Sequence, residues 1–339
     1  MKALLVEAPG EAKVVDIPEP TPTPGQVLLQ VRMVGLCGTD LNTFRGRNPL
    51  VKFPVVIGHE VAATLLEPAS IPDGPTLAAG TDVTLSPYTA CGACPSCLRT
   101  RRNACEFNQT YGVQRHGAMT ERIAEFPEKL YPARLSVKEF AMVEPLTIGF
   151  HAVARGEVSA DDTVAVIGCG GVGLGAVSGA AARGARTIAV DVDDAKLALA
   201  RKAGATDVIH SGREDLHERL AALTGGRGPD CIIEAIGLPA TFRAAVEEVA
   251  FTGRVVYIGY AKEPVAYETR LFVQKELDIR GSRNALPDDF RAVIRMLEAG
   301  HFPTDDAVSA VVPIEEAPEM LRRWSENPSA FSKIMVKIS

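Results

Sequence analysis

Short apolar segments alternate with longer amphipathic ones throughout the second half of the chain. Residues 164–167 (VAVI) and 187–190 (TIAV) are β-branched runs of the length that buried parallel strands have. Four more such runs follow, at residues 207–209, 231–236, 254–258 and 277–280. Segments with helical periodicity lie between them, at residues 195–203, 214–223 and 240–250. The pattern predicts six strands joined by helices, which is an α/β fold with a doubly wound parallel sheet.

The first third of the chain has a different pattern. Its apolar runs lie at residues 3–6, 14–17 and 27–34. Between the last two, PEPTPTPG forms a rigid extended turn, because successive prolines fix φ and remove N–H donors. We therefore expect an antiparallel β region here. Near the carboxyl end we expect a helix at residues 288–299 and strands at residues 310–313 and 334–338.

A glycine turn follows the first of the six strands, where the sequence reads GCGGVG. Gly168 allows the tight turn, Gly170 lets the backbone approach a pyrophosphate, and Gly173 lets helix and strand pack closely. Gly171 and Val172 belong to the same turn, and Val172 is expected beneath the pyrophosphate. The helix that starts here offers free N–H groups and its positive dipole end to phosphates. The segment therefore predicts a dinucleotide site.

Asp191 ends the second strand about 20 residues after Gly170, where dinucleotide-binding folds carry an acid. Its carboxylate can accept both ribose hydroxyls and would repel a 2′-phosphate, which favours NAD over NADP. An ordinary glycine loop is one alternative. The strand before the turn and the acid at the expected distance make a dinucleotide site the better interpretation. A membrane span over residues 164–182 is another, and the glycine content and early helix breakers oppose that.

Composition sets further limits. A chain of 339 residues is long enough for two domains with substantial cores. Its net charge of −6 gives no electrostatic reason to expect nucleic acid or an anionic membrane surface. The amino-terminal MKALLVEAPGEAK lacks the apolar core of a signal peptide. We therefore expect a reducing, cytoplasmic compartment, in which the seven cysteines are thiols or metal ligands.

Four of those cysteines lie in the loop at residues 91–105, with the spacing C-x2-C-x2-C-x7-C: Cys91, Cys94, Cys97 and Cys105. Such steps let two thiolates reach one ion, and four thiolates complete a closed tetrahedral zinc shell. An iron–sulfur cluster is the main alternative, because C-x2-C-x2-C also occurs in ferredoxins. Neighbouring arginines indicate either a solvated loop or a nucleic-acid ribbon, and the acidic chain favours the loop.

Two other short clusters carry possible metal ligands. Cys37 is followed closely by Thr39 and Asp40, and His59 and Glu60 follow the apolar run at residues 53–57. A lone cysteine or histidine belongs more often to the core or the surface than to a metal site. Here both occur with a glycine turn and a four-cysteine loop, and that combination favours a metal site.

Together, these motifs resemble the zinc-dependent medium-chain dehydrogenase/reductase superfamily over nearly the whole chain. Glu144 stands where classical alcohol dehydrogenases carry a zinc cysteine, as in the polyol, threonine and sugar-acid branch. Residues 281–290 (GSRNALPDDF) are similar to the L-galactonate-5-dehydrogenase-like proteins. The resemblance implies a GroES-like β-rich catalytic domain, residues 1–146 and 287–339, which carries the zinc loop at residues 91–105. A Rossmann domain, residues 147–286, would be inserted between its two parts.

The resemblance also implies two zinc ions per chain, one of them held by the four-cysteine loop. The catalytic ion would be bound by Cys37, His59, Glu60 and Glu144. One glutamate would bind directly and the other through water or by exchange, and the sequence does not rank them. A carboxylate in place of a second thiolate makes the ion harder and fits an oxygen-rich substrate. Alternatively, Glu144 is an acid at a helix start, where the dipole stabilises it.

The resemblance further implies a route for the alcohol proton. Asp40 would accept the second ring N–H of His59, and Thr39 would pass the proton toward the cofactor ribose. Where many relatives have a histidine that completes this relay, the chain has Asn42, whose amide does not titrate near neutrality. The proton must then leave through water or another group. Two other histidines are candidates, although a structural role is simpler for both: His116 and His151.

Further cofactor residues follow from the same resemblance. Lys196 would lie on the adenosine side. Arg283 would bind a carboxylate or hydroxyl pair of the substrate, with a domain-interface ion pair as the alternative. The residues expected near the nicotinamide are Ile258, Gly259, Tyr260, Ser282, Arg283 and Asn284.

The implied activity is reversible oxidation of a secondary alcohol to a ketone, with hydride transfer to NAD⁺. L-galactonate-like sugar acids lead as substrates, followed by polyols such as sorbitol or galactitol, and then threonine. Because relatives are usually dimers or tetramers, we expect a homo-oligomer without nucleic-acid or membrane partners. One alternative is a zinc-independent reductase of the superfamily, whose members lack the ligands found here. The other is a non-catalytic regulator that binds NAD and zinc.

Overall fold

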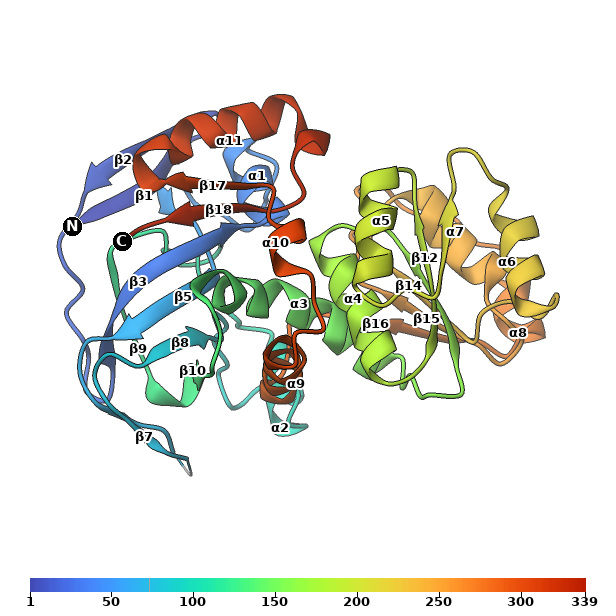
Figure 1. Ribbon diagram of the computed structural model, residues 1–339, viewed down its shortest axis with the longest axis horizontal. Helices are drawn as coiled ribbons and strands as arrows, with labels where there is room; N and C mark the ends of the chain where they lie inside the picture. Colours follow the sequence, from blue (N-terminus) through green and yellow to red (C-terminus); the bar gives the residue numbers. More distant parts are fainter. Residues whose placement is uncertain (73) are drawn as a thin grey trace. The chain divides into compact units, whose positions relative to one another are not determined.

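The computed structural model describes residues 1–72 and 74–339. The chain divides into two compact units, Met1–Glu144 with Thr304–Ser339, and Pro145–Pro303. The first unit therefore contains both the blue and the red ends of the chain in Figure 1. The second division falls after Pro303 and not at residue 287. Helix α9 (Pro287–Glu298) therefore belongs to the second unit, where its Asp289 bonds the ring of His151 at 2.8 Å.

The first unit is built on two mainly antiparallel sheets. The smaller has the order β2-β1-β4, and the larger has the order β10-β8-β5-β3-β18-β17, with β9 paired to β3. Only β17 and β18 run parallel among these described pairs. A short pair, β6 and β7, is separate. The strands are β1 (Lys2–Ala8), β2 (Glu11–Asp16), β3 (Val27–Leu36), β4 (Val55–Val56), β5 (Glu60–Leu65), β6 (Ala69–Ser70), β7 (Thr76–Leu77), β8 (Asp82–Leu85), β9 (Arg122–Glu125), β10 (Leu130–Pro132), β17 (Ala310–Pro313) and β18 (Ile334–Lys337).

Helices close the core of this unit. In α11 (Ala317–Glu326), Met320, Leu321 and Trp324 repeat at helical spacing and are buried. The helix contacts β2 and β17, and it lies along the strands of this unit in Figure 1. The other short helices are α1 (Gly38–Phe44), α2 (Pro95–Leu98), α10 (Thr304–Ala307), η1 (Arg102–Ala104), η2 (Pro127–Lys129), η3 (Ile314–Glu316) and η4 (Pro328–Ala330). The apolar carboxyl-terminal strands thus complete a sheet that the amino-terminal part begins.

The second unit contains the parallel sheet that the apolar runs predict. Its order is β13-β12-β11-β14-β15-β16, and all its pairs are parallel. The direction of winding reverses between β11 and β14, and open α/β sheets generally bind their ligands at the carboxyl ends of the strands at such a point. The elements are β11 (Thr163–Ile167), α4 (Gly171–Ala182), β12 (Arg186–Asp191), α5 (Asp194–Lys202), β13 (Asp207–His210), α6 (Leu216–Thr224), β14 (Cys231–Glu234), α7 (Pro239–Glu248), β15 (Arg254–Tyr257), α8 (Arg270–Gln274) and β16 (Asp278–Gly281).

Helix α3 (Val137–Arg155) begins well before Glu144. Ser136 and Glu139 form a reciprocal cap, with Oγ accepting from the Glu139 N–H and Oε2 accepting from the Ser136 N–H. Pro145 therefore lies inside the helix. Since Glu144 is now mid-helix, its interpretation as a helix-start acid was wrong. No helix in the described part of the chain is long and apolar enough to cross a membrane.

Candidate metal and dinucleotide sites

The first unit brings together Cys37, His59 and Glu60. Cys37 immediately precedes α1, and Glu60 begins β5 directly after His59. One ligand atom from each lies within 4.8 Å of the others. His59 and Glu60 are buried and Cys37 is half-buried. Sulfur, imidazole nitrogen and carboxylate oxygen form a donor set suited to zinc.

Asp40 fixes the two loops that carry these ligands. Its Oδ2 accepts from the Cys37 N–H at 2.9 Å and its Oδ1 accepts from the Gly58 N–H at 3.1 Å. The expected hydrogen bond to His59 is not formed, because Nδ1 lies 3.9 Å from Oδ1. That buried ring nitrogen has no hydrogen-bond partner among the described residues. Burial alone would lower the pKa of His59, but the charges of Cys37 and Asp40 raise it well above its ordinary value.

Glu60 is held by a cation that the sequence motifs did not indicate. The Nζ of Lys333 donates to Oε1 at 2.7 Å and to Oε2 at 2.6 Å, and both side chains are buried. Burial alone would lower the pKa of Lys333, but the charges of Glu60 and Cys37 raise it above its ordinary value. The carboxylate also fills the space above Gly35 on β3, where an added Cβ would lie 1.9 Å from Oε2.

Glu144 has a buried partner of its own, because the hydroxyl of Tyr88 donates to its Oε1. Glu144 is not part of the three-residue group, but its charge interacts with that of His59. Burial raises the pKa of Glu144, although His59 opposes the shift. Burial and the charge of Glu144 raise the pKa of Tyr88 well above its ordinary value. Tyr88 therefore restrains one oxygen of this carboxylate.

The residues considered for the route of the alcohol proton lie on separate elements of the structure. Thr39 and Asn42 are half-buried on α1. His116 accepts from the Val56 N–H at 3.1 Å, and His151 bonds Asp289 in the second unit. Both histidines thus have structural partners.

The four-cysteine loop forms a second group of candidate ligands. The sulfurs of Cys91, Cys94, Cys97 and Cys105 lie within 4.8 Å of one another, and all four cysteines are free thiols. Backbone N–H groups point at these sulfurs: those of Ala93 and Cys94 donate to Cys91 Sγ at 3.4 and 3.3 Å. Four converging sulfurs fit a closed tetrahedral zinc shell.

In the second unit, the glycine turn has the close packing that its spacing predicts. Gly168 has φ +100°, and an added Cβ would lie 2.5 Å from the side chain of Ile236. A Cβ at Gly173 would lie 1.8 Å from the Gly168 carbonyl oxygen, so only glycine fits. Gly170 precedes α4, and an added Cβ there would meet open space. Gly171 and Val172 form the first turn of that helix. The backbone is therefore open where phosphates would approach the helix.

Asp191 lies at the end of β12 and is buried. Its Oδ2 accepts from the Cys169 N–H in the glycine turn at 2.8 Å, and its Oδ1 accepts from the N–H groups of Val192 and Asp193 at 2.7 and 3.1 Å. Asp191 therefore fixes the turn. Lys196, five residues beyond Asp191, is half-buried on α5.

The expected nicotinamide residues lie at the carboxyl ends of β15 and β16. The N–H groups of Ile258 and Gly259 donate to the carbonyl of Glu234 at 2.9 and 3.2 Å, whereas Tyr260 is exposed. Ser282 donates its N–H to Tyr257, and its buried hydroxyl has no partner among the described residues. Arg283 and Asn284 follow directly, and Asn284 has φ +51°.

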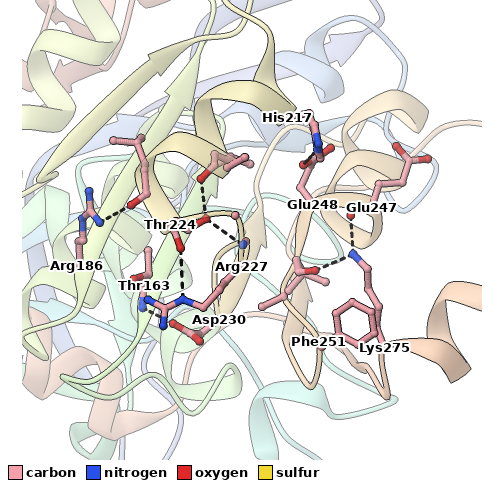
Figure 2. A pocket seen from close by; sticks show the side chains of 18 of the residues that line it. Thr163, Arg186, His217, Thr224, Arg227, Asp230, Glu247, Glu248, Phe251 and Lys275 are labelled. Atoms are coloured by element: carbon pink, nitrogen blue, oxygen red, sulfur yellow. Dashed lines mark hydrogen bonds and ion pairs between the residues drawn. The ribbon is translucent and has the colours of Figure 1, made fainter.

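A cavity of about 700 Å³ lies at the opposite, amino-terminal edge of this sheet (Figure 2). Thr163, Arg186 and Asp230 line it at the starts of strands. Lys275 donates to the carbonyls of Glu247 and Val249 at 2.6 and 2.8 Å, at the end of α7. None of the candidate ligands or cofactor residues lines this cavity.

Comparison with known proteins agrees with this arrangement. The alcohol dehydrogenase GroES-like domain matches residues 23–133, and the zinc-binding dehydrogenase family matches residues 171–299. L-galactonate-5-dehydrogenase of Escherichia coli (strain K12) is 30% identical over 325 residues, which cover 95% of each chain. Sorbitol dehydrogenase of Bacillus subtilis (strain 168) is 31% identical, over 99% of this chain and 97% of that one. The chain belongs to the zinc-dependent medium-chain dehydrogenases.

Two solved structures share the fold over nearly the whole length of the chain. An alcohol dehydrogenase from Escherichia coli CFT073, solved with NADH, has a TM-score of 0.90 at 26% identity and covers 100% of this chain and 99% of its own. A zinc-binding dehydrogenase from Sinorhizobium meliloti 1021, bound to NADP, has a TM-score of 0.89 at 28% identity, covering 99% of each chain. The family and the fold expected from the motifs are confirmed, and the protein is an alcohol oxidoreductase.

Proposed function

We propose that the protein is an NAD-dependent zinc dehydrogenase that reversibly oxidises a secondary alcohol of a sugar acid or polyol to a ketone. The observation that carries the proposal is the buried group of Cys37, His59 and Glu60, with Glu144 electrostatically linked to it. A donor set with carboxylate suits a chelating, oxygen-rich substrate. The relative named L-galactonate-5-dehydrogenase supports the sugar-acid class, and the one named sorbitol dehydrogenase supports polyols.

In this proposal the first unit carries the catalytic chemistry. Cys37 and His59 would hold the zinc, together with Glu144 or Glu60. Zinc bound there would supply a Lewis acid that polarises the substrate oxygen. Thr39 would take up the alcohol proton, and because Asn42 cannot titrate, the proton would leave through water.

The second unit would bind the cofactor, which accepts the hydride. The glycine turn and the start of α4 would bind the pyrophosphate. Asp191 would accept the adenosine ribose hydroxyls through its remaining lone pairs, with Lys196 nearby. Loop residues 258–260 and 282–284 would surround the nicotinamide, and Arg283 would bind a carboxylate or hydroxyl pair of the substrate.

The decisive experiment follows reduced-nicotinamide absorbance with a panel of aldonates, polyols and amino alcohols, each with NAD⁺ and with NADP⁺. We expect turnover of a sugar acid or polyol with NAD⁺, and loss of that turnover after zinc removal. Activity that survives chelation would contradict the role of zinc. Binding of NAD⁺ without turnover of any compound would favour a regulatory protein.

A further inference from the structure

Glu234 is a fully buried carboxylate at the end of β14, beside the point where the winding of the sheet reverses. Three donors converge on its Oε1: the N–H groups of Ile236 and Gly237 at 2.9 and 2.8 Å, and the hydroxyl of Thr241 at 2.7 Å. Such convergence stabilises a negative charge. It also fixes the loop in which Ile236 covers Gly168 of the glycine turn.

The second oxygen of Glu234 has no such partner. Oε2 is buried, and no described residue bonds it. It is directed at Gly259, where an added Cβ would lie only 2.5 Å away. The backbone carbonyl of Glu234 meanwhile accepts from Ile258 and Gly259. One residue therefore holds the loops after β14 and β15 together, with its free oxygen facing the second loop.

Resting on the proposed function, in which residues 258–260 surround the nicotinamide, we infer that the fixed charge of Glu234 favours the oxidised cofactor. The nicotinamide ring is a cation in NAD⁺ and neutral in NADH. A buried carboxylate oxygen without a counter-charge therefore attracts the first form and not the second. At an assumed separation of about 10 Å and an effective dielectric constant of about 20, one unit charge would change such an equilibrium by roughly tenfold.

The test measures the dissociation constants of NAD⁺ and NADH by equilibrium dialysis, on the full chain and on Glu234→Gln. The amide keeps an acceptor for the three donors and removes the charge. We expect the constant for NAD⁺ to rise roughly tenfold while that for NADH changes less than about threefold. An equal loss for both forms, or no change in either, would overturn the inference.

Three further variants separate charge from loop structure. Thr241→Val removes one donor and keeps the charge, so the ratio of the two constants should stay unchanged. Glu248→Gln removes a charge beside the cavity at the opposite edge of the sheet and should also leave it unchanged. Glu234→Asp keeps the charge while shortening the side chain, and a lost preference there would contradict the inference even if Glu234→Gln does not fold. Failure of the unmodified protein to bind either dinucleotide would refute the proposed function instead.

Discussion

The ammonium group of Lys333 bonds both carboxylate oxygens of Glu60, at 2.7 and 2.6 Å, in the interior of the first unit. The two residues are 273 positions apart in the sequence, yet they form a buried ion pair. Lys333 also reaches the carbonyl of Leu36, next to Cys37, at 3.4 Å. The carboxyl-terminal part of the chain thus holds a candidate ligand and the end of β3 together.

Removing Lys333 should destabilise the metal-free protein. Lys333→Met leaves the Glu60 carboxylate buried without a counter-charge, which typically costs about 3–5 kcal/mol. Urea unfolding in the presence of a chelator measures this loss. The control is Lys138→Met, because its partner Asp305 is exposed and such a pair contributes less than about 1 kcal/mol. If both variants lose the same unfolding free energy, the Lys333–Glu60 pair contributes no more to stability than an exposed ion pair.

Removing the Tyr88 hydroxyl should weaken zinc binding. Tyr88→Phe frees the Glu144 oxygen that the hydroxyl restrains, and such outer contacts are typically worth about 10- to 100-fold in metal affinity. Competition with a zinc-chelating dye measures the affinity directly. Tyr111→Phe is the matched control, since Tyr111 is equally buried and its hydroxyl bonds a backbone carbonyl of β9. If the zinc affinity of Tyr88→Phe is unchanged, Glu144 does not contribute to zinc binding.

Elemental analysis should find two zinc ions per chain, one for each of the two ligand groups. A substitution in one group should remove only the ion of that group. Cys94→Ser should lose the ion of the loop, and Cys37→Ser the other. Cys169→Ser removes a buried thiol outside both groups and should keep both ions. Iron with inorganic sulfide in the purified protein would instead support an iron–sulfur cluster in the loop.

Asp162 should contribute to stability in a pH-dependent way. Burial alone would raise its pKa, but hydrogen bonds from Arg254 and Ser159 lower it below the ordinary value. A carboxyl with a lower pKa in the folded state stabilises the protein above its unfolded pKa, near 4, and this stabilisation disappears as the pH falls. Asp162→Asn should therefore reduce the loss of unfolding free energy between about pH 5 and pH 3. If the unfolding free energy of Asp162→Asn falls with pH in parallel with that of the unmodified protein, Asp162 does not make this contribution.

Asp191 should control the choice between NAD and NADP. Because its oxygens also accept backbone N–H groups, Asp191→Asn is a milder change than Asp191→Gly: it keeps an acceptor and removes the charge. We expect the ratio of kcat/KM for NAD⁺ to that for NADP⁺ to fall at least about tenfold, or 1.4 kcal/mol. Asp194→Asn, in the exposed first turn of α5, is the control. An unchanged ratio in Asp191→Asn would place the ribose elsewhere.

The fold could be predicted largely because apolar runs and glycine signals are local. The six parallel strands and the close packing at Gly173 follow from short segments of sequence. The start of α3 was missed although the pair Ser136 and Glu139 has the spacing of a capping box.

The partners of the candidate ligands could not be predicted in the same way. Tyr88 and Lys333 carry no motif, and only the folded chain brings them to Glu144 and Glu60. The same holds for Asp289 on α9, which bonds His151 on α3 although the two residues are far apart in the sequence. Contacts of this kind depend on tertiary packing, which a pattern of neighbouring residues does not encode.

Gly35 adds a steric requirement to the candidate metal site of Cys37, His59 and Glu60. The Glu60 carboxylate occupies the volume that a single methyl group would need, so Gly35→Ala would displace it without altering any polar atom. A search for important positions that considers only reactive groups would pass over this residue. Among natural variants of this protein, a change at position 35 should therefore be as rare as a change in a ligand, and it offers a way to disable the site while every ligand remains in the sequence.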